Sequence, residues 1–278
     1  MNKFLLILIM VFAFTGCKGQ DNSSPRPSTA APNVSVIDHS FVIPGLDRER
    51  LARIYLPEDY DSSNDRYPVL YMHDGQNLFD DSTSYVGEWG VDESLNQLAK
   101  ENDFKVIVVG IDHGGEKRMT ELSPWMNLRF GKGEGKEYME FIVKHVKPYV
   151  DKHYRTLPES KNTAIMGSSM GGLISHYAIY AYPDVFSKAG IFSPSYWYNN
   201  KVFTYTENNP VPEDYRMFIL IGEKELGAVP MVENMHSLIL KTGHPEDNCK
   251  LIIDPEGEHN EAFWMNHFMP AVKWLFEL

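Results

Sequence analysis

The stretch AIMGSSMGGLISHYAIY, which runs from Ala164 to Tyr180, decides the predicted fold. Its apolar start is typical of a buried strand, its small residues of a sharp turn, and its remaining residues of a helix. Gly167, Gly171 and Gly172 supply the room that such a turn needs. The two serines between these glycines either belong to a turn that is simply tight, or one of them is held out for chemistry.

The rest of the chain alternates between the same two kinds of segment. Apolar runs rich in β-branched residues predict strands within 67–75, 104–112, 162–167, 188–193, 216–223 and 249–256. Apolar residues at helical spacing predict helices within 87–102, 136–154, 171–183, 229–243 and 263–278. This alternation predicts an α/β fold with a mostly parallel central sheet and helices on both faces. Ahead of it, 34–44 and 50–57 predict an antiparallel strand pair joined by a turn at Pro44.

The first 32 residues differ from the rest. Lys3 precedes an apolar run at 4–14 that is too short to span a bilayer, which is typical of a secretory signal peptide over residues 1–16. The motif FTGC resembles a bacterial lipobox, with Phe14 where leucine is usual, and implies cleavage before Cys17 and lipid attachment to that cysteine. Residues 17–32 are small, polar and proline-rich, which predicts a flexible tether. We therefore expect a secreted protein, lipid-anchored to a bacterial membrane, with one folded domain at 33–278.

Composition narrows the expected partners. The 278 residues carry a formal net charge of −12, whereas binding to nucleic acid or to an anionic membrane surface favours clustered lysines and arginines. The membrane is therefore expected as a partner only through the lipid. The chain has two cysteines, so lipidation of Cys17 would leave Cys249 without an intrachain disulfide partner. No Cys/His zinc pattern occurs, and we expect neither a cofactor nor a catalytic metal.

The turn at 167–171 fits the pattern G-x-S-x-G between a predicted strand and a predicted helix. In that context the central serine, Ser169, is held out above the sheet as a nucleophile, and Ser168 is its structural neighbour. The backbone amide of Met170, at the start of the helix, would face a developing oxyanion. A glycine-rich turn without catalysis is the alternative. A phosphate-binding loop is disfavoured because the lysine of such loops is absent.

A serine nucleophile needs a base, and the base needs an acid that fixes its tautomer. His259 follows the last predicted strand and precedes the last helix, where the chain order Ser…acid…His places the base. Other histidines could take this role: His73, His113 and His176. For the acid, the end of the strand within 216–223 favours Glu225, with Glu223 and Asp254 left open.

The second oxyanion donor is expected from the loop YMHDGQNLFD, where Gly75 would let the backbone turn so that the Gln76 amide faces the site. Aromatic residues also gather near the predicted strand ends: Trp89, Trp125, Phe192, Tyr196, Trp197, Tyr198 and Trp264. Core packing explains most of them. Trp89, Trp125 and especially Trp197 are our candidates for the walls of a substrate pocket.

Several stretches resemble a known family, namely PVLYMHDGQNLFD, GEWGVDE, ELSPW, AIMGSSMGG, PDVFSKAGIFSPSYW and GEHNEAFW. They are similar to the putative esterase family of α/β-hydrolases, which includes feruloyl and acetylxylan esterases, enterochelin-type siderophore esterases and S-formylglutathione hydrolases. The resemblance covers most of residues 40–275. It implies the α/β-hydrolase fold, with Ser169 as nucleophile and His259 as base. Its acid position varies, which keeps the choice of Glu225 open.

The resemblance and the motifs together imply a serine carboxylesterase that works through an acyl-enzyme. We expect it to remove acetyl or feruloyl-type acyl groups from polysaccharides, because an anchored, secreted esterase with aromatic pocket walls suits glycan processing. One alternative is a siderophore esterase that opens an enterobactin-type trilactone. Another is a ligand-binding lipoprotein that has the fold without the activity.

Overall fold

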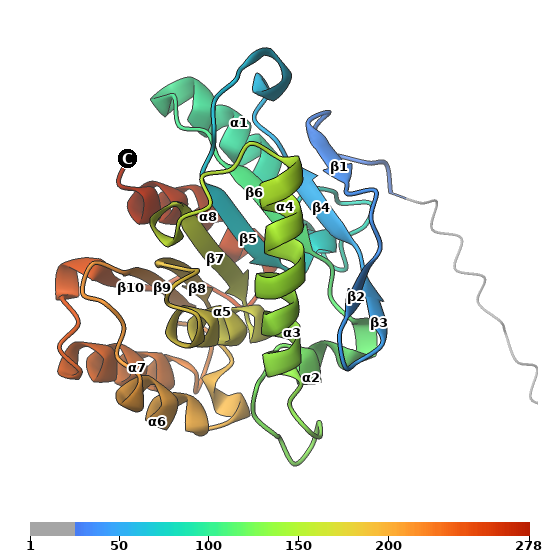
Figure 1. Cartoon of the computed structure of the whole chain (residues 1–278). Coiled ribbons are helices and arrows are strands. Elements are labelled where there is room, and N and C mark those ends of the chain that lie inside the picture. Colours follow the sequence, from blue (N-terminus) through green and yellow to red (C-terminus); the bar gives the residue numbers. More distant parts are fainter. Residues whose placement is uncertain (1–25) are drawn as a thin grey trace, which may run out of the picture.

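The computed structural model describes residues 26–278, so the predicted signal peptide and Cys17 lie outside the described residues. The described part is a central sheet with helices on both sides (Figure 1). Its strands are β1 Val34–Val36, β2 Phe41–Ile43, β3 Arg48–Arg50, β4 Ala52–Tyr55, β5 Val69–His73, β6 Ile107–Ile111, β7 Thr163–Ser168, β8 Lys188–Phe192, β9 Arg216–Gly222 and β10 Cys249–Asp254. Its α-helices are α1 Val91–Asn102, α2 Arg118–Glu121, α3 Gly135–Phe141, α4 Lys147–His153, α5 Met170–Ala181, α6 Lys201–Asn208, α7 Val229–Lys241 and α8 Glu261–Phe276.

The main sheet has eight strands in the order β1-β4-β6-β5-β7-β8-β9-β10. The six strands from β6 to β10 in this order pair in parallel, whereas β4 is antiparallel to both of its neighbours. The structure therefore confirms the predicted α/β fold with a mostly parallel sheet. The carboxyl ends of the parallel strands meet at one edge, where open α/β sheets place their sites.

The antiparallel strands at the N-terminus are also present, with a different pairing in detail. The run predicted as one strand at 34–44 divides around Asp38 into β1 and β2. β1 pairs with β4 at the edge of the main sheet, and β2 forms a separate hairpin with β3. The turn of this hairpin follows Pro44, as predicted, and Asp47 takes the left-handed conformation there with φ 50°.

Two hydrophobic layers bury both faces of the parallel strands, which explains their unbroken apolar runs. In β5, Val69 and Tyr71 face the layer formed by α3, α4, α5 and α7, whereas Leu70 and Met72 face the layer of α1 and α8. The predicted helix within 136–154 is continuous, although a π-helical segment at Ile142–Val146 joins α3 to α4. α6 was not among the predicted elements.

The segment before β1 lies on the surface of the domain. The flexible tether was predicted to extend to residue 32, but residues of the described segment from Arg26 onward contact the loop that precedes α1 and the first turn of α1. The Arg26 guanidinium pairs with Asp81 at 3.0 Å, and the Ala31 amide donates to Asp92 at 2.7 Å. These polar contacts, which an apolar periodicity cannot reveal, hold this segment against the domain.

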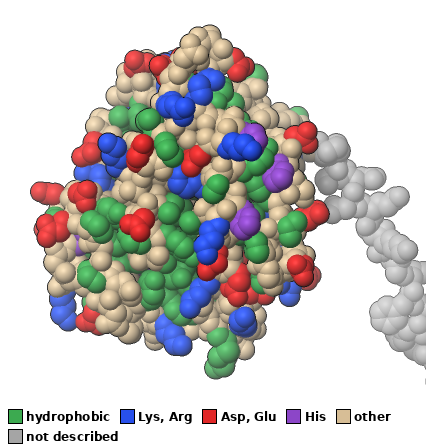
Figure 2. Space-filling view, viewed as in Figure 1, with side chains coloured by type: hydrophobic (Ala, Val, Ile, Leu, Met, Phe, Trp, Pro, Cys, Tyr) green, Lys and Arg blue, Asp and Glu red, His purple; other side chains and the backbone are tan. Residues whose placement is uncertain are grey.

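The surface of the described part carries charges of both signs. Figure 2 shows acidic and basic side chains interspersed over one face of the molecule. Among residues 26–278, no helix has the length and hydropathy required to cross a bilayer.

Candidate active site

The turn between β7 and α5 holds Ser169 in a conformation that non-glycine residues rarely adopt, with φ 60° and ψ −118°. Glycines make this turn possible because three chain segments meet there. A Cβ atom on Gly167 would lie 2.9 Å from the backbone of Gly171, and one on Gly172 would lie 2.7 Å from the carbonyl oxygen of Phe192. The strained turn places Ser169 at the carboxyl end of β7, at the N-terminus of α5.

His259 lies in the loop between β10 and α8. The Asn260 side chain caps α8 by accepting a hydrogen bond from the Phe263 amide at 2.9 Å, which fixes the position of the residue just before it. The loop after β9 crosses close to this segment, because Gly222 and Gly257 approach each other. A Cβ atom on Gly222 would lie 2.3 Å from the carbonyl carbon of Gly257. This close approach brings the predicted acid to the predicted base.

Glu225 hydrogen-bonds to His259, with 2.6 Å between Oε2 and Nδ1. Its other oxygen accepts hydrogen bonds from the Ser193 hydroxyl at 2.5 Å and from the Gly222 amide at 3.0 Å. Burial by itself would raise the pKa of Glu225, but the bonds from His259, Ser193 and Gly222 lower it below its ordinary value. Glu225 is therefore an ionised carboxylate, and it orients the imidazole with Nε2 free for another partner.

Ser193 and Trp264 complete the surroundings of this pair. The Trp264 indole N–H donates to the Ser193 hydroxyl at 2.9 Å, and the ring packs edge-on against His259 with 5.0 Å between centroids. Ser193 has φ 42°, so its backbone is also in the left-handed region. A chain of hydrogen bonds thus runs from Trp264 through Ser193 to Glu225 and His259, which restricts the position of the imidazole.

A cavity of about 290 Å³ opens at this edge of the sheet. It is lined by His73, Asp74, Asn77, Tyr85, Val86, Trp89, His113, Arg118, Ser168, Ser169, His259, Glu261 and Trp264. The structure therefore brings Ser169 and His259, which are 90 residues apart in the chain, to one cavity. Within the described residues the Ser169 hydroxyl has one hydrogen-bond partner, the Ser195 hydroxyl at 3.3 Å, and no bond joins it to His259.

Two backbone amides near the cavity, those of Gln76 and Met170, have no hydrogen-bond partner within the part of the chain that the structure describes. Met170 is the first residue of α5, and Gln76 lies in the short 3-10 helix Gly75–Asn77 after β5. Asp74, with φ 58°, makes the turn that we had expected from Gly75. Gly75 is needed for a different reason, since a Cβ atom there would lie 2.7 Å from the backbone of Gly110.

Charges in the cavity largely balance. The Arg118 guanidinium binds Asp74 with two hydrogen bonds of 2.6 and 2.8 Å. Burial would raise the pKa of Asp74, but Arg118 lowers it below its ordinary value. Burial lowers the pKa of His73 to about 4, so this histidine is neutral, and burial also raises the pKa of Glu261. The Arg118 guanidinium, the ionised Asp74 carboxylate and the Glu261 carboxyl group therefore face the cavity alongside His259.

The three tryptophans predicted as pocket walls differ in their positions. Trp89 lines the cavity, whereas Trp125 and Trp197 are not among its lining residues. Trp125 packs edge-on against Tyr177, with 5.7 Å between ring centroids, and Trp197 is 53% exposed. Apolar character near strand ends predicts that a residue packs, but it does not distinguish a pocket wall from a layer beside it.

The other candidates for base and acid have their own environments. His176 is buried in α5, where it hydrogen-bonds to Tyr196 and Thr206. Asp254 contacts His267 at 2.8 Å, and Glu223 is exposed. Of the three acids left open by the sequence, Glu225 is the one that contacts His259.

Some residues of the site were not predicted, namely Ser193, Ser195, Arg118, Tyr85, Val86 and Glu261. Ser193 and Ser195 follow β8 directly, in the stretch FSPSYW, and the end of that strand was a signal that could have identified them. Tyr85 and Val86 are 84% and 62% exposed, and they belong to the loop between β5 and α1. That loop has no periodic pattern, so only the fold reveals that it borders the cavity.

Comparison with known proteins supports this description of the fold. The family described as "Putative esterase" matches residues 43–275. The uncharacterized protein YbbA of Bacillus subtilis is 27% identical over 237 residues, which cover 80% of this chain and 91% of YbbA.

Two solved structures share the fold. The siderophore hydrolase EstA from Aspergillus nidulans has a TM-score of 0.73 at 18% identity, covering 91% of this chain and 97% of EstA. A ferulic acid esterase has a TM-score of 0.68 at 17% identity, covering 88% and 98% of the two chains. The family match spans most of the chain and the fold is shared with both solved structures, so this protein is a member of the Putative esterase family with the α/β-hydrolase fold.

Proposed function

We propose that this esterase is a serine carboxylesterase in which Ser169 is the nucleophile, His259 the general base and Glu225 the acid that orients it. The observation that carries the proposal is the shared cavity. The strained serine and the imidazole held by Glu225 line the same space of about 290 Å³. Strain of this kind persists only where the surrounding structure fixes it, and it clusters at active sites.

In the proposed reaction the Ser169 hydroxyl leaves Ser195, rotates toward His259 Nε2 and attacks the ester carbonyl as the imidazole takes its proton. The Gln76 and Met170 amides stabilise the oxyanion, each contributing about 3 kcal/mol of barrier lowering. The imidazolium then protonates the departing alcohol oxygen, which leaves the acyl group on Ser169. Water, deprotonated by the same imidazole, releases the acid and restores the serine. Glu225 stabilises the imidazolium in both steps.

The variant Ser169→Ala tests this mechanism. We expect it to lower the hydrolysis of short p-nitrophenyl esters by at least about 10⁴-fold and to abolish labelling by a fluorophosphonate probe. Ser168→Ala is the matched control, since Ser168 lines the same cavity one residue earlier and should retain most activity. Near-normal turnover by Ser169→Ala would refute the proposal. Failure of the wild-type protein to react with the probe would instead favour a ligand-binding protein without activity.

For the substrate, we propose an uncharged acyl ester carried by a polysaccharide, with an acetyl or feruloyl-type acyl group. The cavity is at the small end of ligand pockets, so it suits an acyl group while the glycan stays outside. Trp89 and Trp264 offer apolar walls for that group. An anionic substrate such as a catecholate siderophore would meet Asp74 and Glu261, with Arg118 already paired.

A panel of acetylated xylan, a feruloylated oligosaccharide and enterobactin tests this assignment. We expect the glycan esters to give the higher kcat/KM. Preferential hydrolysis of enterobactin would show that the protein is a siderophore esterase, as the neighbour EstA is described to be a siderophore hydrolase.

We also propose that lipid on Cys17 anchors the enzyme to a bacterial membrane, on the strength of the FTGC motif and the apolar run before it. Cys17→Ser should move the protein from the membrane fraction to the soluble fraction and abolish incorporation of labelled palmitate. Unchanged palmitate incorporation by this variant would contradict the assignment.

A further inference from the structure

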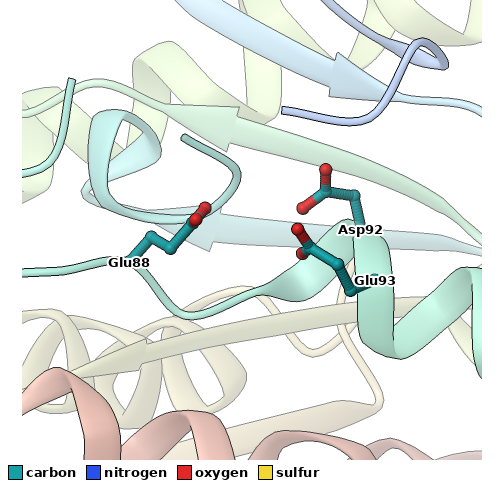
Figure 3. Close-up of side chains that lie close together, drawn as sticks. All are labelled: Glu88, Asp92 and Glu93. Atoms are coloured by element: carbon teal, nitrogen blue, oxygen red, sulfur yellow. The ribbon is translucent and has the colours of Figure 1, made fainter. Parts of the chain in front are cut away.

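Three carboxylates converge at the start of α1, outside the cavity described above. Glu88 comes from the loop before the helix, and Asp92 and Glu93 come from its first turn. One ligand oxygen from each lies within 4.8 Å of the other two. Figure 3 shows the three side chains directed toward a common space. Like charges this close repel one another, so the arrangement needs a physical explanation.

Two oxygens of this cluster are buried without a hydrogen-bond donor. Asp92 is 0% exposed, and its Oδ2 accepts from the Ala31 amide at 2.7 Å, whereas its Oδ1 has no partner within the described chain. The Glu88 carboxylate likewise has one paired and one unpaired oxygen. Its Oε1 accepts a hydrogen bond from the Thr29 hydroxyl at 2.5 Å, whereas its Oε2 is buried without a partner in the part of the chain that the structure describes. Buried polar atoms are rarely left unpaired in native proteins.

The surrounding charges do not compensate for the cluster. Within residues 26–278, no lysine, arginine or histidine forms an ion pair with Glu88, Asp92 or Glu93. Asp80 and Asp81 add further negative charge near Glu88, and Arg26, the cation on this segment, is paired with Asp81. The cluster therefore lacks a positive charge.

We propose that Glu88, Asp92 and Glu93 form a binding site for a divalent cation of the oxygen-preferring class, with Ca²⁺ as the best-fitting ion. Carboxylate oxygens are the ligands that Ca²⁺ prefers, and its flexible coordination accepts an irregular set of six to eight oxygens. Glu88, Asp92 and Glu93 each offer one oxygen to the ion. Glu93 is exposed, so its side of the site is open to water, which completes the coordination.

The site would join two segments that lie far apart in the sequence. Thr29 and Ala31 bind the cluster from the N-terminal segment, and Glu88 directly precedes Trp89, a wall of the cavity. A bound cation would hold the loop at 80–90 against the start of α1 and keep the N-terminal segment in place. The effect is structural, so its test is independent of ester hydrolysis.

Isothermal titration of the purified, chelator-treated protein with CaCl₂, together with thermal unfolding with and without Ca²⁺, tests the proposal. We expect one Ca²⁺ per chain, and a Tm that rises with Ca²⁺ concentration because the ion binds the folded state. Asp92→Asn should bind Ca²⁺ at least tenfold more weakly and lose most of the Tm response. If Asp92→Asn does not fold, Glu93→Gln takes its place in the test, because Glu93 is exposed and its position tolerates substitution. Glu93→Gln should also bind Ca²⁺ more weakly and show a smaller Tm response.

Glu246→Gln is the control, because Glu246 is exposed and precedes β10 at the other edge of the sheet. It should bind Ca²⁺ as the wild type does. The absence of binding heat and of a Tm shift up to about 10 mM Ca²⁺, above the weakest dissociation constants of extracellular Ca²⁺ modules, would overturn the proposal. Equal Ca²⁺ binding by wild type, Asp92→Asn and Glu93→Gln would overturn it as well, since the ion would then be bound elsewhere.

Discussion

Replacing Ser169 by glycine should make the protein more stable than replacing it by alanine, although both variants lack the hydroxyl. At φ 60° and ψ −118° a residue with a Cβ atom costs about 1–3 kcal/mol, and glycine relieves that strain. Glycine also costs about 0.5–1 kcal/mol, because it has more freedom to lose on folding. Subtracting the second range from the first leaves a net advantage for Ser169→Gly over Ser169→Ala of about 1 kcal/mol at the midpoints, within limits of about 0 and 2.5 kcal/mol. Comparing the two variants cancels the loss of the bond to Ser195.

Urea unfolding of both variants measures this difference, and thermal unfolding should show it as about 2–4 °C per kcal/mol for a domain of this size. The matched control is the same pair of substitutions at Ser168, which ends β7 with an ordinary backbone. There the glycine variant should be the less stable one. If Ser169→Gly is no more stable than Ser169→Ala, the backbone at residue 169 is not strained, and the main structural argument for a nucleophile at this position is lost.

Two further predictions concern Glu225. Glu225→Gln should lower kcat for p-nitrophenyl esters by roughly 10²–10⁴-fold with little change in KM, because an amide cannot stabilise the imidazolium, whereas the exposed Glu223→Gln should leave kcat near the wild-type value. The free energy of unfolding should also depend on pH through Glu225, because the pKa of its carboxyl is lower in the folded state than its ordinary value of 4.5. The ionised carboxylate therefore stabilises the protein at pH values above 4.5. This stabilisation is lost as the pH falls through the pKa of the folded state. Urea unfolding at pH 6 and near pH 4 should therefore show the difference between wild type and Glu225→Gln narrowing on acidification, and a constant difference would contradict this.

The sequence predicted the order of strands and helices well, because buried parallel strands leave an unmistakable pattern. β5, β6, β7, β8, β9 and β10 are continuous apolar runs separated by helices with an apolar face. The N-terminal strands were harder to assign. Residues 34–44 hold two short apolar runs on either side of the polar residues 38–40, and each run pairs with a different strand. Pairing is a tertiary property, and a single short run does not encode it.

The sequence predicted those residues of the candidate site that directly follow the end of a strand. Ser169, His259 and Glu225 each follow the end of a strand, and the parallel sheet brings those ends together. Residues that reach the cavity from loops followed no such rule. Arg118 enters from α2, well beyond the end of β6, and Tyr85 enters from an aperiodic loop.

The choice of glutamate for the proposed acid follows from where β9 ends. Gly222 closes the strand, and Glu225 comes three residues later in the turn. Its Oε1 reaches back to the Gly222 amide at 3.0 Å while Oε2 reaches His259 at 2.6 Å, so the carboxylate must span from its own strand to the loop after β10. An aspartate at this position would be one methylene shorter, so we expect it to hold both partners only if the turn moves. The close approach of Gly222 and Gly257 opposes such a movement. A longer side chain can thus reach the same histidine from a position further along the loop. The position of the acid in the sequence can therefore be predicted from the end of the strand only when the length of its side chain is considered as well.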